Sequence, residues 1–157
     1  MKKNEYLQTS TRFYIDDFIA KTDSRINTPY TPTGFTELDK VLDGGFYEGL
    51  YVIGAISSLG KTTFALQVAD SIARSGQDVL IFSLEQSRFE LVAKSMSRLT
   101  AELAQARREP SLAKSARDIT VYERLNRFSD DELENLMNAR QRYKDEVSEH
   151  IFIKEGM

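Results

Sequence analysis

One segment, Gly54-Ala55-Ile56-Ser57-Ser58-Leu59-Gly60-Lys61-Thr62-Thr63, holds the residues most able to do chemistry. A loop that ends in Gly-Lys-Thr at the start of a helix directs its backbone N–H groups at one anion. The lysine of such a loop pairs with the β- and γ-phosphates of a nucleotide, and the next hydroxyl ligates Mg²⁺. The spacing therefore predicts a phosphate-binding loop in which Lys61 and Thr62 are the reactive side chains.

The loop departs from the usual pattern at its first position, where Ala55 replaces glycine and Gly54 stands one residue early. The alternative is a chance strand–glycine–helix turn. The flanking sequence favours phosphate binding, because an apolar run at 50–53 predicts a strand before the loop. An amphipathic pattern over 61–74 predicts a helix after it.

A second candidate is Glu85, which directly follows the apolar run 79–82. A carboxylate at the C-terminal end of a parallel strand can reach a phosphate bound at the same sheet edge. Taken alone, the residue is better explained as a surface glutamate near a helix N-terminus, where negative charge is also favourable. The residues by themselves therefore leave the catalytic role of Glu85 open.

The composition limits the class of protein. The chain has 157 residues, no cysteine, one histidine and a net charge of −3. That length suits one domain, and histidine clusters and thiolate metal sites are excluded. No apolar run approaches a membrane span and no signal peptide is visible, so we expect a cytoplasmic protein without a membrane partner. The acidic balance means that nucleic-acid contacts must come from a local patch, an assembly or sequence outside this chain.

The N-terminal region predicts a helix followed by a linker. Apolar side chains recur at helical spacing over 10–21, and two prolines in 22–34 favour an extended path. The helical stripe is narrow and aromatic (Phe13, Tyr14, Ile15, Phe18, Ile19). It fits packing on its own domain and docking on a neighbouring subunit equally well, because periodicity does not choose between them.

The central region predicts a β-α-β unit. A short helix at 36–42, with Thr36 as N-cap, precedes a strand at 50–54. The helix at 61–74 is expected to bury Phe64, Val68 and Ile72, and the unbroken apolar strand 79–82 to be buried on both faces. The crossover between the two strands should be right-handed.

The C-terminal region predicts two capped helices and a strand. Capping boxes begin at Ser87 and Ser129, and a final strand spans 151–153. The expected inward faces are Phe89, Val92, Ala93, Met96 and Leu99 for the first helix, and Leu133, Leu136, Met137, Tyr143 and Val147 for the second. The basic residues Arg107, Arg108, Lys114 and Arg117 between them are interpreted as a solvated face.

Residues 33–99 resemble the ATPase domain of the DnaB-like replicative hexameric DNA helicases, a branch of the RecA family. The resemblance rests on Thr33-Gly34-Phe35-Thr36-Glu37-Leu38-Asp39, on Gly44-Gly45 with Gly49-Leu50, on Gly60-Lys61-Thr62-Thr63 and on Phe82-Ser83-Leu84-Glu85. Ala55 agrees with it, since DnaB-like loops commonly start with alanine. The finer likeness is to helicase-like proteins of bacteriophages or mobile elements.

The resemblance implies an α/β fold: a partial RecA-like P-loop NTPase with a mostly parallel sheet flanked by helices and preceded by a linker helix. It implies that ATP and Mg²⁺ bind through Ser58, Leu59, Gly60, Lys61, Thr62 and Thr63, with Thr62 on the metal. It also implies catalytic roles for Lys61 and Glu85, the latter orienting or activating the attacking water.

The resemblance also divides the chain. Residues 1–32 correspond to a tail, a linker helix and a linker, and 33–157 to the N-terminal portion of the ATPase domain, cut before the Walker B strand. In the complete form, ATP hydrolysis in a hexameric ring would drive translocation on single-stranded DNA and duplex unwinding, with a primase or loader as further partner. We expect this chain alone to bind nucleotide weakly and to hydrolyse it slowly or not at all.

Two other functions remain open from the sequence. The chain is either another RecA-family ATPase, recombinase-like or clock-type, or a non-catalytic fragment that binds nucleotide or docks on a hexamer through 10–21. Ser83-Leu84-Glu85 and Ala55 argue against the first of these.

Overall fold

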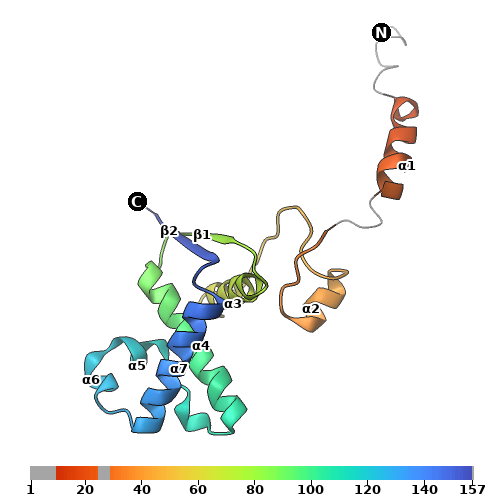
Figure 1. The fold of residues 1–157 in the computed structure, drawn as a ribbon. Coiled ribbons are helices and arrows are strands. Elements are labelled where there is room, and N and C mark those ends of the chain that lie inside the picture. Colours follow the sequence, from red (N-terminus) through yellow and green to blue (C-terminus); the bar gives the residue numbers. More distant parts are fainter. Residues whose placement is uncertain (1–9, 25–28, 157) are drawn as a thin grey trace.

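The computed structural model describes residues 10–24 and 29–156, an α/β arrangement in which helices outnumber strands (Figure 1). Its elements are η2 (Thr11–Phe13), α1 (Ile15–Ser24), α2 (Thr36–Val41), α3 (Lys61–Arg74), β1 (Val79–Ser83), α4 (Arg88–Arg107), η4 (Pro110–Leu112), α5 (Ala116–Thr120), α6 (Tyr122–Leu125), α7 (Asp130–Glu146) and β2 (Ile151–Glu155). Within these described ranges, no helix is both long enough and apolar enough to cross a membrane.

The sheet consists of β1 and β2, which pair in parallel from Val79 opposite Ile151 to Ser83 opposite Glu155. Both strands were predicted, and both run slightly further than the apolar residues indicate. Parallel neighbours need a long crossover, and here α4 to α7 provide it. The parallel sheet flanked by helices is therefore confirmed.

The predicted strand at 50–54 is wrong, because residues 51–56 form no regular secondary structure. A strand needs a neighbour for its backbone groups, and the one bridge outside β1 and β2 in the described residues pairs Thr31 with Phe46. Leu50 and Val52 are accordingly 90% and 83% exposed. The predicted β-α-β unit through α3 is not formed, and the one observed runs from β1 to β2.

The prediction that β1 is buried on both faces is also wrong. Burial alternates along the strand, and Leu80 and Phe82 are 59% and 65% exposed. Phe152 of β2 is exposed beside them. Helices α3 and α4 contact the sheet on one side, below the strands in Figure 1. The unbroken apolar run is therefore typical of a sheet that is covered on both faces, whereas one face of β1 is exposed here.

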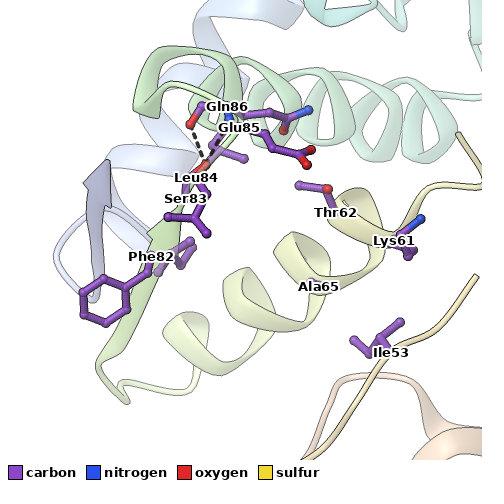
Figure 2. A pocket seen from close by; sticks show the side chains of 11 residues that line it. Ile53, Lys61, Thr62, Ala65, Phe82, Ser83, Leu84, Glu85 and Gln86 are labelled. Atoms are coloured by element: carbon purple, nitrogen blue, oxygen red, sulfur yellow. Dashed lines mark hydrogen bonds between the residues drawn. The ribbon is translucent and has the colours of Figure 1, made fainter. Parts of the chain in front are cut away.

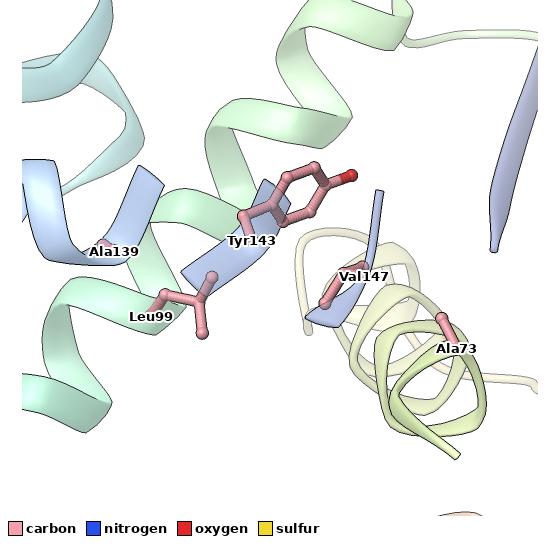
Figure 3. Close-up of a cluster of buried hydrophobic side chains, with 5 residues drawn as sticks. All are labelled: Ala73, Leu99, Ala139, Tyr143 and Val147. Atoms are coloured by element: carbon pink, nitrogen blue, oxygen red, sulfur yellow. The ribbon is translucent and has the colours of Figure 1, made fainter. Parts of the chain in front are cut away.

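The core lies between helices rather than between helices and sheet. Its buried centre joins α3, α4 and α7 through Ala73, Leu99, Ala139, Tyr143 and Val147 (Figure 3). Partly buried apolar side chains surround it, among them Ile151 at the start of β2. This cluster fixes α3, and hence the loop before it, relative to β1.

Because the core has this position, the helix faces differ from the predicted ones. In α3, Phe64 and Ile72 are half-buried rather than buried, and Leu66 and Ala73 face the core with Val68. Phe89 in α4 and Met137 in α7 are 66% and 58% exposed. Leu133 is exposed as well. The remaining predicted inward residues are buried or half-buried.

The predicted capping boxes are confirmed. Ser87 accepts a hydrogen bond from the Glu90 backbone N–H, Ser129 does the same for Glu132, and each glutamate bonds back to its serine. A third box at Ser115 begins α5 and was not predicted. These caps satisfy the free N–H groups of each first turn.

The Thr-Gly-Phe lead-in closes a turn that is fixed to α3. Asp39 Oδ1 accepts from Thr33 N at 2.8 Å and from Thr33 Oγ1 at 2.7 Å, and these bonds hold the pKa of Asp39 below its usual value. Gly34 has φ +86°, and a side chain there would collide with Ser71 of α3. Phe35 precedes α2 as its N-cap residue, so the predicted N-cap at Thr36 is wrong by one position.

The predicted helix at 10–21 is confirmed as η2 followed by α1, which ends at Ser24. Its apolar stripe is exposed, with Phe13 and Phe18 above 60%. In Figure 1, α1 lies apart from the other helices. Packing of the stripe on the described part of its own domain is therefore not observed. Part of the predicted linker, 25–28, lies outside the described residues.

The basic stretch is not a uniformly solvated face. Arg107 pairs with Glu134 at 2.8 Å on the surface, as interpreted from the sequence. The Lys114 side chain, by contrast, is only 12% exposed, pairs with Glu132 and lies 5.0 Å above the Phe128 ring. Lys114 therefore ties the α5 region to α7 instead of facing solvent.

A buried carboxylate links α3 to α4. Asp70 is fully buried and accepts hydrogen bonds from Ser95 Oγ and Arg98 Nη2, both at 2.6 Å. Arg98 also pairs with Glu102 one turn further along α4. A buried charge is tolerated only when such partners surround it.

We predict that Arg98→Ala lowers the free energy of unfolding by about 3 kcal/mol, since it leaves the Asp70 charge buried without its cation. Urea denaturation followed by circular dichroism measures the change. The matched control is Arg107→Ala, which removes an exposed pair and should change stability little. Equal effects of the two substitutions would contradict the structural role given to Asp70.

Candidate functional site

The loop before α3 has the backbone conformation of an anion-binding turn. Ser58 and Gly60 have φ values of +63° and +93°, and α3 begins at Lys61. Gly60 is the N-cap residue and no side chain caps the helix. The first backbone N–H groups of α3 therefore have no side-chain acceptor. They lie at the positive end of the helix dipole.

Gly60 meets a conformational requirement rather than a steric one. Nothing lies within 4 Å of the position that a Cβ would take, but φ +93° is a value that residues with side chains rarely adopt. Ser58 adopts the left-handed region despite its side chain. Two left-handed residues so close together turn the chain sharply into the helix.

Lys61 bridges the loop. Its Nζ donates to the carbonyl oxygens of Ala55 at 3.1 Å and Ile56 at 3.3 Å. Both acceptors are neutral, and a cation bonds more strongly to an ionised oxygen than to a neutral one. The side chain is exposed, so exchange of these acceptors for phosphate oxygens requires no buried bond to break.

A pocket of about 450 Å³ brings the two sequence candidates together. Lys61, Thr62 and Glu85 all line it, with Ile53 on one side and β1 on the other. Figure 2 shows the Glu85 carboxylate directed toward the Thr62 side chain at the start of α3. Thr62, at the start of α3, and Glu85, 23 positions later and just after β1, thus meet at one edge, as the strand-end argument predicts.

The remaining predicted residues lie in the loop or in the first turn of α3, but not on the pocket wall. Ser58, Leu59, Gly60 and Thr63 are exposed and are not part of the lining. The predicted contribution of Ser58, Leu59 and Gly60 is through their backbone N–H groups, and that of Thr63 is to help bind the phosphates; both stay predictions. Leu59 is 67% exposed, and its backbone N–H bonds to the Ile56 carbonyl at 3.4 Å.

Glu85 and Thr62 have free polar atoms. In the described part of the chain neither side chain has a hydrogen-bond or ion-pair partner, and both are exposed. A glutamate whose only role is to cap α4 would bond to that helix, but Glu90 of the capping box takes this role. The surface interpretation of Glu85 as a helix-start charge is therefore less well supported than a role in the pocket.

The residues that hold the Glu85 loop were not predicted from the sequence. Ser83 Oγ donates to the Gln86 carbonyl at 2.5 Å and accepts from the Gln86 N–H at 3.2 Å. Lys94 Nζ donates to Gln86 Oε1 at 3.0 Å. The serine in Ser83-Leu84-Glu85 was an available signal, because a serine hydroxyl commonly bonds to backbone groups a few residues along.

Residues 31–149 match the family model described as the DnaB-like helicase C-terminal domain, which is more than half of the chain. The chain belongs to this family. The match includes the lead-in turn, the phosphate loop, β1 and the helices up to α7, and it ends before β2.

Individual relatives agree. The chain is 44% identical over 66 residues to the replicative DNA helicase DnaB of Geobacillus stearothermophilus, covering 41% of this chain and 14% of the relative. It is 35% identical over 92 residues to that of Buchnera aphidicola, covering 55% and 20%. A probable replicative DNA helicase of Guillardia theta is 31% identical over 121 residues, covering 73% and 20%. The chain thus spans about a fifth or less of these relatives, and the resemblance to phage or mobile-element proteins stays a prediction.

We predict that Gly60→Ala lowers the free energy of unfolding by about 1–2 kcal/mol, because a side chain must adopt a left-handed conformation there. Chemical denaturation measures it. Gly49→Ala is the control, since Gly49 has open space around it and no such φ. A Gly60→Ala variant as stable as Gly49→Ala would show that the loop does not require this conformation.

Proposed function

We propose that this chain carries the ATP-binding face of a replicative DNA helicase. The observation that carries the proposal is the joint lining of one pocket by Lys61, Thr62 and Glu85. The family match supports it, as do the relatives, which are named as replicative DNA helicases. In this proposal residues 1–32 form the tail, linker helix and linker, and 33–157 the first portion of the ATPase domain.

The residues of the loop fit a magnesium nucleotide. The uncapped start of α3 and the left-handed turn at Ser58 and Gly60 supply backbone donors for phosphate oxygens. Lys61 neutralises charge on the β- and γ-oxygens, and the unbonded Thr62 hydroxyl is a ligand for Mg²⁺. When bound, the ion shields the charge that develops on the transferred phosphoryl group. Leu59 and Thr63 contribute through their backbone and hydroxyl positions.

Glu85 is the proposed general base. Its carboxylate orients a water and accepts its proton as the water oxygen bonds to the γ-phosphorus. The bond to the bridging oxygen breaks at the same time, leaving ADP and inorganic phosphate. The exposed carboxylate without a partner in the described residues supports this role.

The complete protein would use this reaction to move along single-stranded DNA as a hexameric ring and to separate duplex strands, with a primase or loader as partner. Two residues of the basic stretch, Arg107 and Lys114, pair with glutamates and are not free to bind DNA. DNA contacts are therefore assigned to other parts of the protein. The exposed stripe of α1 is the proposed contact with a neighbouring subunit.

A non-catalytic role is the second candidate. The pocket is open to solvent and the 50–53 segment joins no sheet, so the site is incomplete beside Ile53. Nucleotide binding without turnover by the chain alone would be consistent with both candidates. Another RecA-family ATPase, recombinase-like or clock-type, is disfavoured by the family match.

We predict that Lys61→Ala weakens binding of an ATP analogue with Mg²⁺ by about 10- to 100-fold, because it removes a charge-assisted bond to phosphate. Calorimetric titration measures the affinity, and circular dichroism checks that the fold is kept. The control is Lys144→Ala, which removes an exposed lysine of α7 far from the pocket lining. Unchanged affinity in Lys61→Ala would refute the assigned role.

We predict that the chain self-associates as its concentration rises, and that Phe18→Glu shifts it to monomer. The substitution places a charge in the middle of the exposed stripe, where docking would bury it. Sedimentation velocity gives the distribution of species. Tyr122→Glu changes an exposed aromatic residue of α6 and should leave association intact. A monomer at all concentrations would argue against the stripe as a subunit contact.

A further inference from the structure

The end of β2 packs on the loop that carries Glu85. Gly156 N donates to the Ser83 carbonyl at 2.7 Å. A Cβ on Gly156 would lie 3.0 Å from Leu84 Cδ2, which is closer than nearly all real contacts. The chain beyond β2 therefore lies directly against Leu84, the residue before Glu85. A segment 70 residues away in sequence forms one wall of the loop.

Glu155, the last residue of β2, contacts the start of α4. Its Oε1 accepts from the Arg88 backbone N–H at 2.5 Å, and its Oε2 lies 3.3 Å from Arg88 Nη2. Arg88 is the first residue of α4, so its N–H has no acceptor inside the helix. The parallel register brings this about, because it sets Glu155 opposite Ser83 at the same sheet edge.

The charge on Glu155 suits this position. A carboxylate at the start of a helix is stabilised by the helix dipole and by the free N–H groups. The Arg88 backbone N–H, followed by its guanidinium, holds the pKa of Glu155 below its usual value. Glu155 is therefore ionised at neutral pH and binds as a charged acceptor.

Hydrogen bonds thus hold the residues around Glu85, while the Glu85 side chain itself has no such bond in the described residues. Gln86, the residue after Glu85, is held by hydrogen bonds to Ser83 and Lys94. Arg88, three residues after Glu85, is held by its hydrogen bond to Glu155. The Glu85 side chain has no polar partner in the parts of the chain that the structure describes. Its position at the pocket therefore depends on the backbone of this short loop.

We propose that Glu155 is a positioning residue for Glu85: by binding the first turn of α4, it keeps the Glu85 loop beside Thr62. The inference rests on the proposed function, in which Glu85 acts on water at the pocket. Glu155 is not part of the pocket lining and lies against no reacting atom. It acts through Arg88.

The test measures backbone order without nucleotide. Amide order parameters at Glu85 and Gln86 are determined by ¹⁵N relaxation in the whole chain. We expect values of about 0.85 in the parent and below about 0.6 in Glu155→Ala. Glu155→Gln keeps a carbonyl acceptor for the Arg88 N–H and should restore the high values. Glu155→Asp keeps the charge but is one methylene shorter, so it should behave like Glu155→Ala.

Two controls separate local positioning from general destabilisation. Lys154→Ala alters a neighbouring side chain that has no bonded partner in the described residues, and should leave the loop ordered. The Glu132 amide in the α7 capping box should keep its order in every variant. If Glu155→Ala does not fold, Glu155→Asp decides the question.

Unchanged order at Glu85 and Gln86 in the Ala and Asp variants would overturn the proposal. So would a loss of order that also reaches Glu132, or a Gln variant as mobile as the Ala variant. Because no nucleotide is present, a chain that fails to bind ATP leaves this result intact. Failure of the proposed function and failure of the positioning role are therefore distinguishable.

Discussion

The packing of α3 against α4 and α7 is the constraint on which the site depends. Ala73 is buried in the shared core, and Asp70 is held by Ser95 and Arg98. These contacts fix the C-terminal half of α3, and a rigid helix then fixes its own start. The uncapped N-terminus with Thr62 is thereby set opposite the end of β1 and Glu85. The loop itself is exposed and contributes little to the core. The core therefore positions the candidate site through α3 and not through contacts with the loop.

How far the sequence predicted this structure depends on whether the signal was local. The capping boxes at Ser87 and Ser129, the start of α3 at Lys61 and the strand at 79–82 were predicted correctly, because each depends on residues within a few positions. The strand at 50–54 was not, because strand formation depends on a partner, and the described chain offers none there. Phe89 and Met137 were assigned to inner faces for a related reason: periodicity shows that a face is apolar, not what covers it.

The site was predicted in part for the same physical reasons. Lys61 and Thr62 follow from a contiguous motif, and both line the pocket. Glu85 required the resemblance to a family, since an isolated glutamate after a strand has several explanations. Glu155 was not found, because its contact with Arg88 joins residues far apart in sequence through the register of β1 and β2. No short pattern encodes such a contact.

Two exposed apolar surfaces, the stripe of α1 and the face with Leu80 and Phe82, set the chain apart from a closed domain. Large apolar patches on soluble proteins usually mark contact surfaces. The site at the sheet edge lies beside the second surface, and Ile53 and Phe82 both line its pocket. Completion of the site and burial of this face are therefore connected, which accounts for our expectation of weak nucleotide binding by the chain alone.

The central claim is that the start of α3 and the Glu85 loop form one nucleotide site. The most direct measurement is an NMR titration of the labelled chain with Mg²⁺ and a non-hydrolysable ATP analogue, a method that also detects weak binding. The account predicts that amides 58–63 and 83–86 shift together along one saturation curve. Saturable binding that leaves both segments unmoved, or shifts confined to another part of the chain, would contradict it.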